Sequence, residues 1–182
     1  MVTVVKPPNI SDVKGFPVKI FLGGSIEMDK AKKWQDLAEK LIFIGSEKIK
    51  GDIVVLNPRR DSWDSSLKQS IDCPEFKEQV DWELDALDAS DYIIMNFDPE
   101  TMSPISLLEL GLHAMSSNLL VICPDGFWRK GNVDIVCKRY GIGQFPTLEA
   151  AVDFIFDKEV KRESEAFSFS SKISSNVKGF KR

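Results

Sequence analysis

Two neighbouring segments decide the fold of this chain: Tyr92-Ile93-Ile94-Met95-Asn96-Phe97 and, after a short gap, Ser103-Pro104-Ile105-Ser106-Leu107-Leu108-Glu109-Leu110-Gly111. The first is a continuous apolar run, which is typical of a strand buried on both faces of a parallel sheet. The second opens an apolar helix that ends near residues 116–118. Glu109 therefore lies near the start of a helix that follows a strand. In an open α/β sheet, ligands bind in the crevice outside the carboxyl ends of the strands.

Glu109 is the first candidate functional residue. It is flanked by apolar residues, Leu108 and Leu110 among them. An unpaired buried charge is costly, so a carboxylate in such surroundings is unusual. The alternative is that Glu109 only complements the helix N-terminus, which favours acidic side chains. The local pattern leaves both interpretations open.

Strand and helix patterns alternate on either side of this unit. Apolar runs predict strands at 18–22, 52–56, 92–97 and 118–122, and helical periodicity predicts helices at 30–43, 75–89, 133–140 and from 148 onward. The residues expected to face the core are Trp34, Leu37, Ala38 and Leu41 in the first helix, Val80, Leu84 and Leu87 in the second, and Leu148, Ala151, Phe154 and Ile155 in the last. This alternation implies right-handed crossovers. We expect an α/β fold, a single-domain doubly wound (Rossmann- or flavodoxin-like) parallel sheet of about five strands with helices on both faces.

The two ends of the chain differ from this central domain, which we place at residues 18–157. Residues 1–17 are interrupted by prolines and polar residues and predict an extended lead-in. Residues 158–182 repeat Ser, Lys and Glu with scattered Phe, and predict a flexible tail.

Composition narrows the classes of function. The net charge of −4 offers no basic field, so binding of a nucleic acid polymer is not expected. The three cysteines form an odd set without metal-type spacing, which favours a reducing compartment and indicates neither a disulfide framework nor a metal site. No apolar run approaches the ~18 residues that a membrane span needs. We expect a cytoplasmic protein with no cofactor, no metal and no membrane contact.

A glycine pair ends the first predicted strand. Gly23, Gly24 and Ser25 allow a tight turn and a close approach of the backbone to a ligand. The sequence matches neither a dinucleotide fingerprint nor a P-loop, so a small polar ligand such as a sugar fits better. A simple strand-to-helix turn is the alternative.

Two further groups of residues are candidates for binding a planar ligand. In the loop after the second strand, Trp63 lies beside Asp61 and two arginines and could stack on a heterocycle, or could pack into the core instead. In the second long helix, the spacing of Gln79, Trp82 and Glu83 allows them to point at one spot. The alternative for these three is a solvated helix face.

Together these segments resemble the nucleoside 2-deoxyribosyltransferase family, in particular its nucleoside 2-deoxyribosyltransferase-like branch. The resemblance spans about residues 18–155, and it depends on the order and spacing of the segments more than on any one of them. The segments that carry it are Phe21-Leu22-Gly23-Gly24-Ser25, Asn57-Pro58-Arg59-Arg60-Asp61-Ser62-Trp63, Gln79 with Trp82-Glu83, Ser103 to Gly111, and Gly131-Asn132-Val133.

The resemblance implies roles for three residues. Glu109, in the Glu-Leu-Gly motif, would be the nucleophile. Glu83, 26 positions earlier, would be the acidic residue near the base, with Asp61 as second choice for the acid. Asn132 would reach the sugar hydroxyl in a neighbouring subunit's site, which implies a homodimer or a higher assembly of dimers with shared sites.

One residue departs from the family pattern. The better-known transferases carry an aspartate that contacts the base six residues before the nucleophile, where this chain has Ser103. Asp98 or Asp61 could compensate for it.

The implied function is transfer of 2-deoxyribose between nucleobases in nucleotide salvage, through a covalent deoxyribosyl-glutamate. Gly23, Gly24, Ser25, Ser103 and Ser106 would hold the sugar and Trp63 would pack on the base. The partners would be small molecules, namely nucleosides or nucleotides and free nucleobases.

Two alternatives remain open. The first is hydrolysis of 2'-deoxynucleoside 5'-monophosphates, with Ser103, Ser106 and Arg59 as a phosphate cradle. The second is a non-catalytic nucleotide-sensing protein, supported by the Ser103 departure and the tail.

Overall fold

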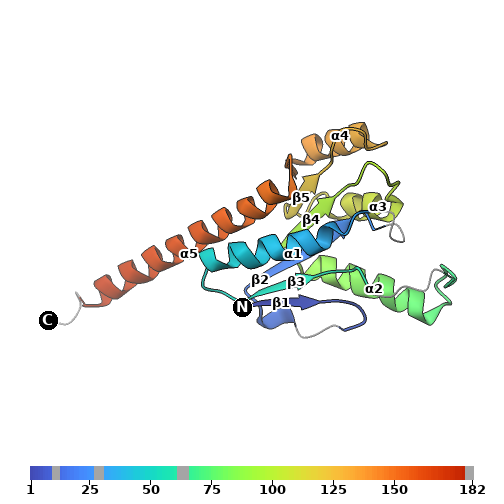
Figure 1. The fold of residues 1–182 in the computed structure, drawn as a ribbon. Helices are drawn as coiled ribbons and strands as arrows, with labels where there is room; N and C mark the ends of the chain where they lie inside the picture. Colours follow the sequence, from blue (N-terminus) through green and yellow to red (C-terminus); the bar gives the residue numbers. More distant parts are fainter. Residues whose placement is uncertain (10–12, 27–30, 61–65, 179–182) are drawn as a thin grey trace.

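The computed structural model describes residues 1–9, 13–26, 31–60 and 66–178, with backbone alone for 170–178. Within these residues, six parallel strands form one sheet in the spatial order β1-β3-β2-β4-β5-β6 (Figure 1). The strands are β1 (Val2–Val5), β2 (Val18–Gly24), β3 (Ile53–Leu56), β4 (Tyr92–Asn96), β5 (Leu119–Ile122) and β6 (Gly143–Gln144). The predicted single-domain α/β fold with a parallel sheet is confirmed, with six strands instead of about five.

Helices cover both faces of the sheet, as doubly wound folds require. The helices are α1 (Trp34–Gly45), α2 (Pro74–Ala89), α3 (Pro104–His113), α4 (Lys130–Tyr140) and α5 (Leu148–Lys178), with short 3₁₀ helices at Val13–Gly15 and Ser46–Lys48. One core cluster joins α1 and α5 to the sheet, and a second joins α2, α3 and α4 to its other face. Because β2 and β4 lie in the centre, the loops that follow them meet at one edge of the sheet.

The amino-terminal segment is part of the sheet. The predicted lead-in contains β1, which pairs in parallel with β3 from Val2 opposite Ile53 to Val5 opposite Leu56. The segment is rich in valine, which favours strands, but it is too short to stand out among its polar neighbours.

Three apolar residues expected in the core are instead partly exposed. Leu37 in α1, Leu84 in α2 and Phe154 in α5 are 44%, 40% and 46% exposed. In α2, the buried face carries Gln79 and Trp82, along with Ala86 and Leu87. Of the predicted stripe, Leu87 is fully buried, whereas Leu84 is exposed and the indole ring of Trp82 is buried in addition.

Helix α5 is much longer than predicted. Thr147 caps it, because its Oγ1 accepts a hydrogen bond from the Ala150 amide at 3.2 Å. The helix then continues through the expected tail to Lys178 and extends away from the sheet (Figure 1). Residues 148–178 contain no glycine or proline, the two residues with the lowest helix propensity, so the sequence is compatible with a helix over this whole range.

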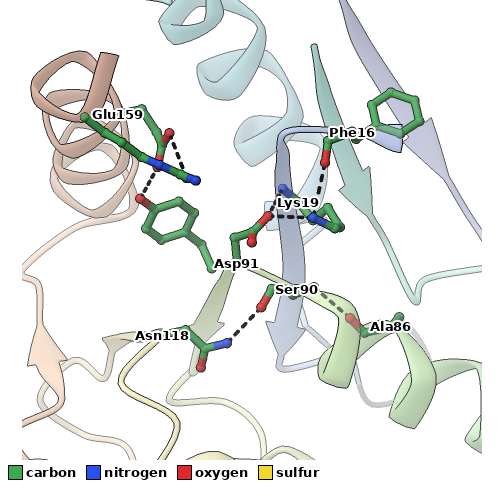
Figure 2. Close-up of polar contacts among 9 residues, drawn as sticks. Phe16, Lys19, Ala86, Ser90, Asp91, Asn118 and Glu159 are labelled. Carbon is green, nitrogen blue, oxygen red and sulfur yellow. Dashed lines mark hydrogen bonds and ion pairs between the residues drawn. The ribbon is translucent and has the colours of Figure 1, made fainter. Parts of the chain in front are cut away.

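Polar contacts fasten the amino ends of the central strands, on the side away from the loops that follow β2 and β4 (Figure 2). Lys19 Nζ donates to Asp91 Oδ2 at 3.0 Å and to the Phe16 carbonyl at 3.2 Å. Asn118 Nδ2 donates to the Ser90 carbonyl at 2.9 Å, which joins the start of β5 to the end of α2. These contacts position the sheet.

The first part of α5 is held to the sheet by a buried pair. The Tyr92 hydroxyl donates to Glu159 Oε1 at 2.5 Å, and Arg162 Nη1 lies 3.6 Å from Glu159 Oε2. Burial and the neighbouring Glu159 raise the pKa of Tyr92, so its phenol stays a hydrogen-bond donor. In the described part of the chain, no helix has the length and apolar composition to cross a membrane.

Candidate active site

The turn after β2 is a close approach between two strands. Gly24 has φ +123°, and a Cβ atom there would lie 2.2 Å from the Asn96 carbonyl oxygen of β4. Ser25 N donates to that same oxygen at 2.9 Å. Gly23 is tight as well, since its Cβ would meet Met95 Sδ at 2.8 Å. Packing of β2 on β4 thus explains both glycines, and a ligand contact at them remains a prediction.

Three buried hydroxyl groups meet beside this turn. Ser25 Oγ and Ser103 Oγ are 2.6 Å apart, and Thr101 Oγ1 lies 2.8 Å from each of them. The backbone amide of Asp98 donates to Ser25 Oγ at 2.8 Å. Ser103 has φ +45°, a left-handed conformation that lets the chain turn into α3. The sequence predicted Ser25 and Ser103; it gave no signal for Thr101, which lies in the irregular segment before α3.

Ser106 connects the segment after β2 to the first helical turn of α3. Its Oγ donates to the Gly24 carbonyl at 2.7 Å. The structure therefore brings together four of the predicted sugar-binding residues, Gly24, Ser25, Ser103 and Ser106. They lie where β2 and β4 end, at the crevice in which open α/β sheets bind ligands.

Glu109 lies on the buried face of α3, with Ser106 and Leu110, and is only 8% exposed. Burial raises its pKa, and the negative charge of Glu83 raises it further, to about 8. The second of the two open interpretations, a simple complement to the helix N-terminus, does not explain this burial. An exposed position would serve the helix dipole without the cost of desolvation.

Glu83 approaches from α2 and is held by its own helix and by the loop after β3. Gln79 Nε2 donates to Glu83 Oε1 at 2.7 Å and to the Pro58 carbonyl at 3.1 Å. Arg60 Nε donates to Gln79 Oε1. Burial raises the pKa of Glu83, while the Gln79 hydrogen bond and the Arg60 charge act in the lowering direction. The half-buried carboxyl group of Glu83 on α2 and the buried one of Glu109 on α3 are thus close enough to interact.

The helical spacing correctly predicted that Gln79 and Glu83 lie together. Trp82, which was expected to join them, points elsewhere. The Trp82 ring is buried in the core, and its Nε1 donates to the Asn9 carbonyl at 3.1 Å. Arg60 belongs to the segment 57–63 that carries the resemblance, but it was assigned no role, because its contact with α2 could not be predicted from the sequence.

A second polar network lies at the start of α1 and was missed by the sequence analysis. Asn57 Nδ2 donates to Glu39 Oε1 at 2.7 Å, and Arg59 Nη1 donates to Gln35 Oε1 at 3.4 Å. Gln35 is fully buried, and its Nε2 has no hydrogen-bond partner within the described part of the chain. Glutamine at a helix start gives no periodic signal of burial.

The other predicted residues lie apart from the carboxyl pair or outside the described chain. Asn132 is in α4 and lines a groove of about 290 Å³ between α3 and α4. The carboxylate of Asp98 accepts from the backbone amides of Lys32 and Glu100 at 3.4 and 3.0 Å. Asp61 and Trp63 lie outside the described residues. Among the described residues, no group of three His, Cys, Asp or Glu side chains is placed to hold a metal ion.

Comparison with known proteins identifies the family. The model of the family described as "Nucleoside 2-deoxyribosyltransferase like" matches residues 17–127, more than half of the chain. The chain belongs to this nucleoside 2-deoxyribosyltransferase-like family. The match includes β2, the loop after β3, both carboxyl groups and the α3 motif, which are four of the five segments that carry the predicted resemblance; the fifth, Gly131-Asn132-Val133, lies beyond it.

A solved structure supports the fold. It is titled "Crystal structure of conserved protein from Enterococcus faecalis V583" and superposes with a TM-score of 0.53 at 14% identity, covering 80% of this chain and 98% of that one. At this identity the likeness shows the fold alone. No curated protein matches the chain. Family membership indicates a glycosyl-transfer-related enzyme whose substrates are small molecules of the nucleoside or nucleobase type.

Proposed function

We propose that this family member is a nucleoside 2-deoxyribosyltransferase that exchanges the base of 2'-deoxynucleosides, with Glu109 as nucleophile and Glu83 as general acid and base. The observation that carries the proposal is the interaction between two desolvated carboxyl groups, the buried Glu109 and the half-buried Glu83, at the carboxyl edge of the sheet. Pairs of carboxyl groups in unlike environments are the usual means of splitting glycosidic bonds with retention.

The reaction takes two steps. The Glu109 carboxylate attacks the anomeric carbon, the bond from that carbon to the base nitrogen breaks, and Glu83 gives its proton to the departing base. A second base then attacks the same carbon, releases Glu109 as a carboxylate and returns a proton to Glu83. Water in place of the second base gives hydrolysis.

The hydroxyl cluster supports a place for the sugar beside Glu109. Ser25, Thr101 and Ser103 hold one another at hydrogen-bond distance, so their oxygens are pre-positioned. Ser103 is engaged in this cluster and takes the position of the family's base-contacting aspartate. Base recognition therefore falls to other residues, and the carboxyl groups of Glu83 and Asp98 are candidates.

The proposal is tested by base exchange. Purified protein receives a panel of 2'-deoxynucleosides with a different free base, and products are separated by chromatography. We expect a new nucleoside, and a loss of at least ~10³-fold in turnover for Glu109→Gln, the scale seen when a catalytic nucleophile is removed. Asp81→Asn, which removes an exposed carboxylate from α2 that pairs with Lys77, is the matched control. Exchange that survives Glu109→Gln would refute the assignment, and nucleoside binding without any product would favour the non-catalytic alternative.

Hydrolysis of 2'-deoxynucleoside 5'-monophosphates is the second candidate. The observation in its favour is the set of hydroxyls at the N-terminus of α3, a position suited to an anion. Against it, Ser106 donates to Gly24 and Arg59 donates to Gln35, so two of the three expected cradle members already serve protein groups. Release of free base from a deoxynucleoside monophosphate, without need of an acceptor base, would establish this reaction instead.

The exposed face of α3 supports assembly as a dimer. Ile105, Leu108 and Leu112 are 59%, 59% and 60% exposed and follow one another at helical spacing, and Met115, in the turn just after α3, is 84% exposed. Contiguous apolar surface of this kind marks an interface. The groove that holds Asn132 is lined by Leu107, Leu110 and Gly111 of this same helix. A second copy packed here fits the expectation that Asn132 completes a neighbouring site.

Mass measurement by light scattering tests the assembly. We expect a dimer or a multiple of dimers for the wild type and a monomer for Leu108→Glu, which places a charge in the apolar stripe. Glu100→Gln, on the exposed loop before α3, serves as control. A monomeric wild-type protein with full exchange activity would exclude shared sites.

A further inference from the structure

Both amide N–H groups of Gln79 are used within the protein. One donates to the Pro58 carbonyl at 3.1 Å and the other to Glu83 Oε1 at 2.7 Å. The amide oxygen accepts from Arg60 Nε. The side chain is 7% exposed. Gln79 was predicted to bind substrate, yet it has no donor left for a ligand.

Arg60 determines which way this amide points. A guanidinium group can only donate hydrogen bonds, so the amide oxygen must face Arg60 and the NH₂ group must face Glu83. A fixed donor favours the ionised form of a carboxyl group. The contacts therefore form a directed chain from Arg60 through Gln79 to Glu83, and the charge of Arg60 adds to the effect.

We propose that Gln79 is a positioning residue: anchored by Arg60, it holds the negative charge of the carboxyl pair on Glu83 and leaves the proton on Glu109 in the substrate-free protein. The catalytic meaning of this inference rests on the proposed function. There, the attacking group is an ionised Glu109 and the acid is a protonated Glu83, which is the reverse arrangement.

The charges around the pair agree with this placement. Among the described residues, Arg60, from the loop after β3, is the charged group that acts on Glu83, and Glu83 itself is the charged group that acts on Glu109. Both carboxyl groups are penalised by burial, but within the described chain only Glu83 has a donor and a cation to offset it. Glu109 has a like charge beside it instead, so it retains the proton.

As a consequence, a proton must move from Glu109 to Glu83 before Glu109 can attack the substrate. The O–H bond of Glu109 breaks and an O–H bond of Glu83 forms, so the total charge of the pair is unchanged. A substrate that separates Gln79 from Glu83 favours this transfer, because Glu83 then loses the donor that stabilises its charge. Gln79 thus couples occupation of the site to formation of the nucleophile.

The test follows the two carboxyl groups directly. Full-length protein labelled with ¹³C at glutamate carboxyl carbons is titrated by NMR, with Glu83→Gln and Glu109→Gln used to assign the signals. In Gln79→Met, which keeps the side-chain length and removes the donor, we expect the Glu83 midpoint to rise and the Glu109 midpoint to fall, each by about one pH unit. Arg60→Met, which releases the anchor, should move both midpoints in the same directions.

Asp81→Asn is the matched control. It removes a carboxylate from the same helix, and this carboxylate pairs with Lys77. It should leave both midpoints in place. The inference is overturned if Gln79→Met and Arg60→Met leave the midpoints unchanged, or if Asp81→Asn moves them equally. A purely structural role of Gln79 would lower the melting temperature without moving either midpoint.

This titration needs no turnover, so its outcome is independent of the exchange assay. Shifted midpoints in a protein that exchanges no base would support the proton placement and refute the proposed function. Glu109-dependent exchange with unmoved midpoints would leave the proposed function standing and refute this inference alone.

Discussion

The burial of the Glu109 carboxyl group has two opposing effects. It suits a reactive group, but it costs the folded protein free energy when the group ionises. Its pKa of about 8 lies above the ordinary glutamate value of 4.5. The unfolded chain therefore releases this proton at lower pH than the folded protein. The contribution of protonated Glu109 to the free energy of unfolding is fully present below pH 4.5 and is lost as the pH rises through about 8.

Glu109→Gln should consequently stabilise the protein in alkaline solution. We expect equal stabilities of variant and wild type near pH 4.5, and an advantage for the variant on the order of 4 kcal/mol at pH 9, where the wild type carries the buried charge. Urea unfolding at both pH values measures the difference. A constant difference across this range would contradict the raised pKa.

The pH dependence of the reaction follows from the same pair. In the proposed mechanism the reactive form has one proton, on Glu83. We therefore expect kcat/KM to pass through a maximum and to fall above about pH 8, where Glu109 loses its proton while Glu83 is already ionised. In Glu83→Gln this alkaline fall should vanish, because Glu109 is then the remaining titrating member of the pair. Initial rates between pH 5 and 10 provide the measurement. An alkaline fall that persists in Glu83→Gln would assign it to another group.

At the scale of elements, α2 illustrates how a helix chooses the face that it buries. Its apolar residues suggested a stripe through Leu84, but the structure buries Trp82 at 3% exposure and leaves Leu84 at 40%. Trp82→Ala should therefore cost about 3–5 kcal/mol of unfolding free energy, as expected for a large buried ring. Leu84→Ala, its control on the same helix, should cost less than about 1 kcal/mol. Equal losses in chemical unfolding would restore the predicted stripe.

The elements that the sequence predicted well are those with one dominant signal. Strands β2 to β5 are continuous apolar runs, and the α3 motif combines a proline at the helix start with a buried glutamate. The misplaced or missed parts depend on partners distant in the chain. β1 becomes a strand by pairing with β3, and Gln35 is buried at the start of α1, where Arg59 meets it. For the site, the pattern located Glu109, Glu83 and Gln79, but not Arg60 or Thr101, whose positions depend on how loops fold.

At the scale of the whole molecule, α5 consists of a packed part and a projecting part. Up to Glu163 it contacts the body: Glu159 accepts from Tyr92, and Glu163 accepts from the Lys50 amide at 2.9 Å. Farther along, Phe167 and Phe169 are 77% and 70% exposed. Figure 1 shows this end extending away from the sheet.

Two truncations separate these parts. Ending the chain after Ser164 should change the melting temperature by less than about 2 °C, because the anchoring contacts remain. Ending it after Lys158 removes Glu159 and leaves the buried Tyr92 hydroxyl without its acceptor, which should cost about 1–3 kcal/mol, or roughly 2–12 °C. Calorimetry on both proteins provides the comparison. Similar melting temperatures would mean that Tyr92 and Glu159 do not fasten the helix.

The all-parallel sheet also has a consequence for the speed of folding. Its paired strands lie far apart along the chain, from 23 residues for Leu120 and Gly143 to 72 residues for Ile20 and Tyr92. No strand of this sheet can find its partner through a tight hairpin, so each pairing must close a long loop before it gains any contacts. Chains dominated by such distant pairings fold slowly. The two central strands, β2 and β4, which position the candidate active site, require the longest loop closure in the sheet. We therefore expect this site to form only once that pairing is complete.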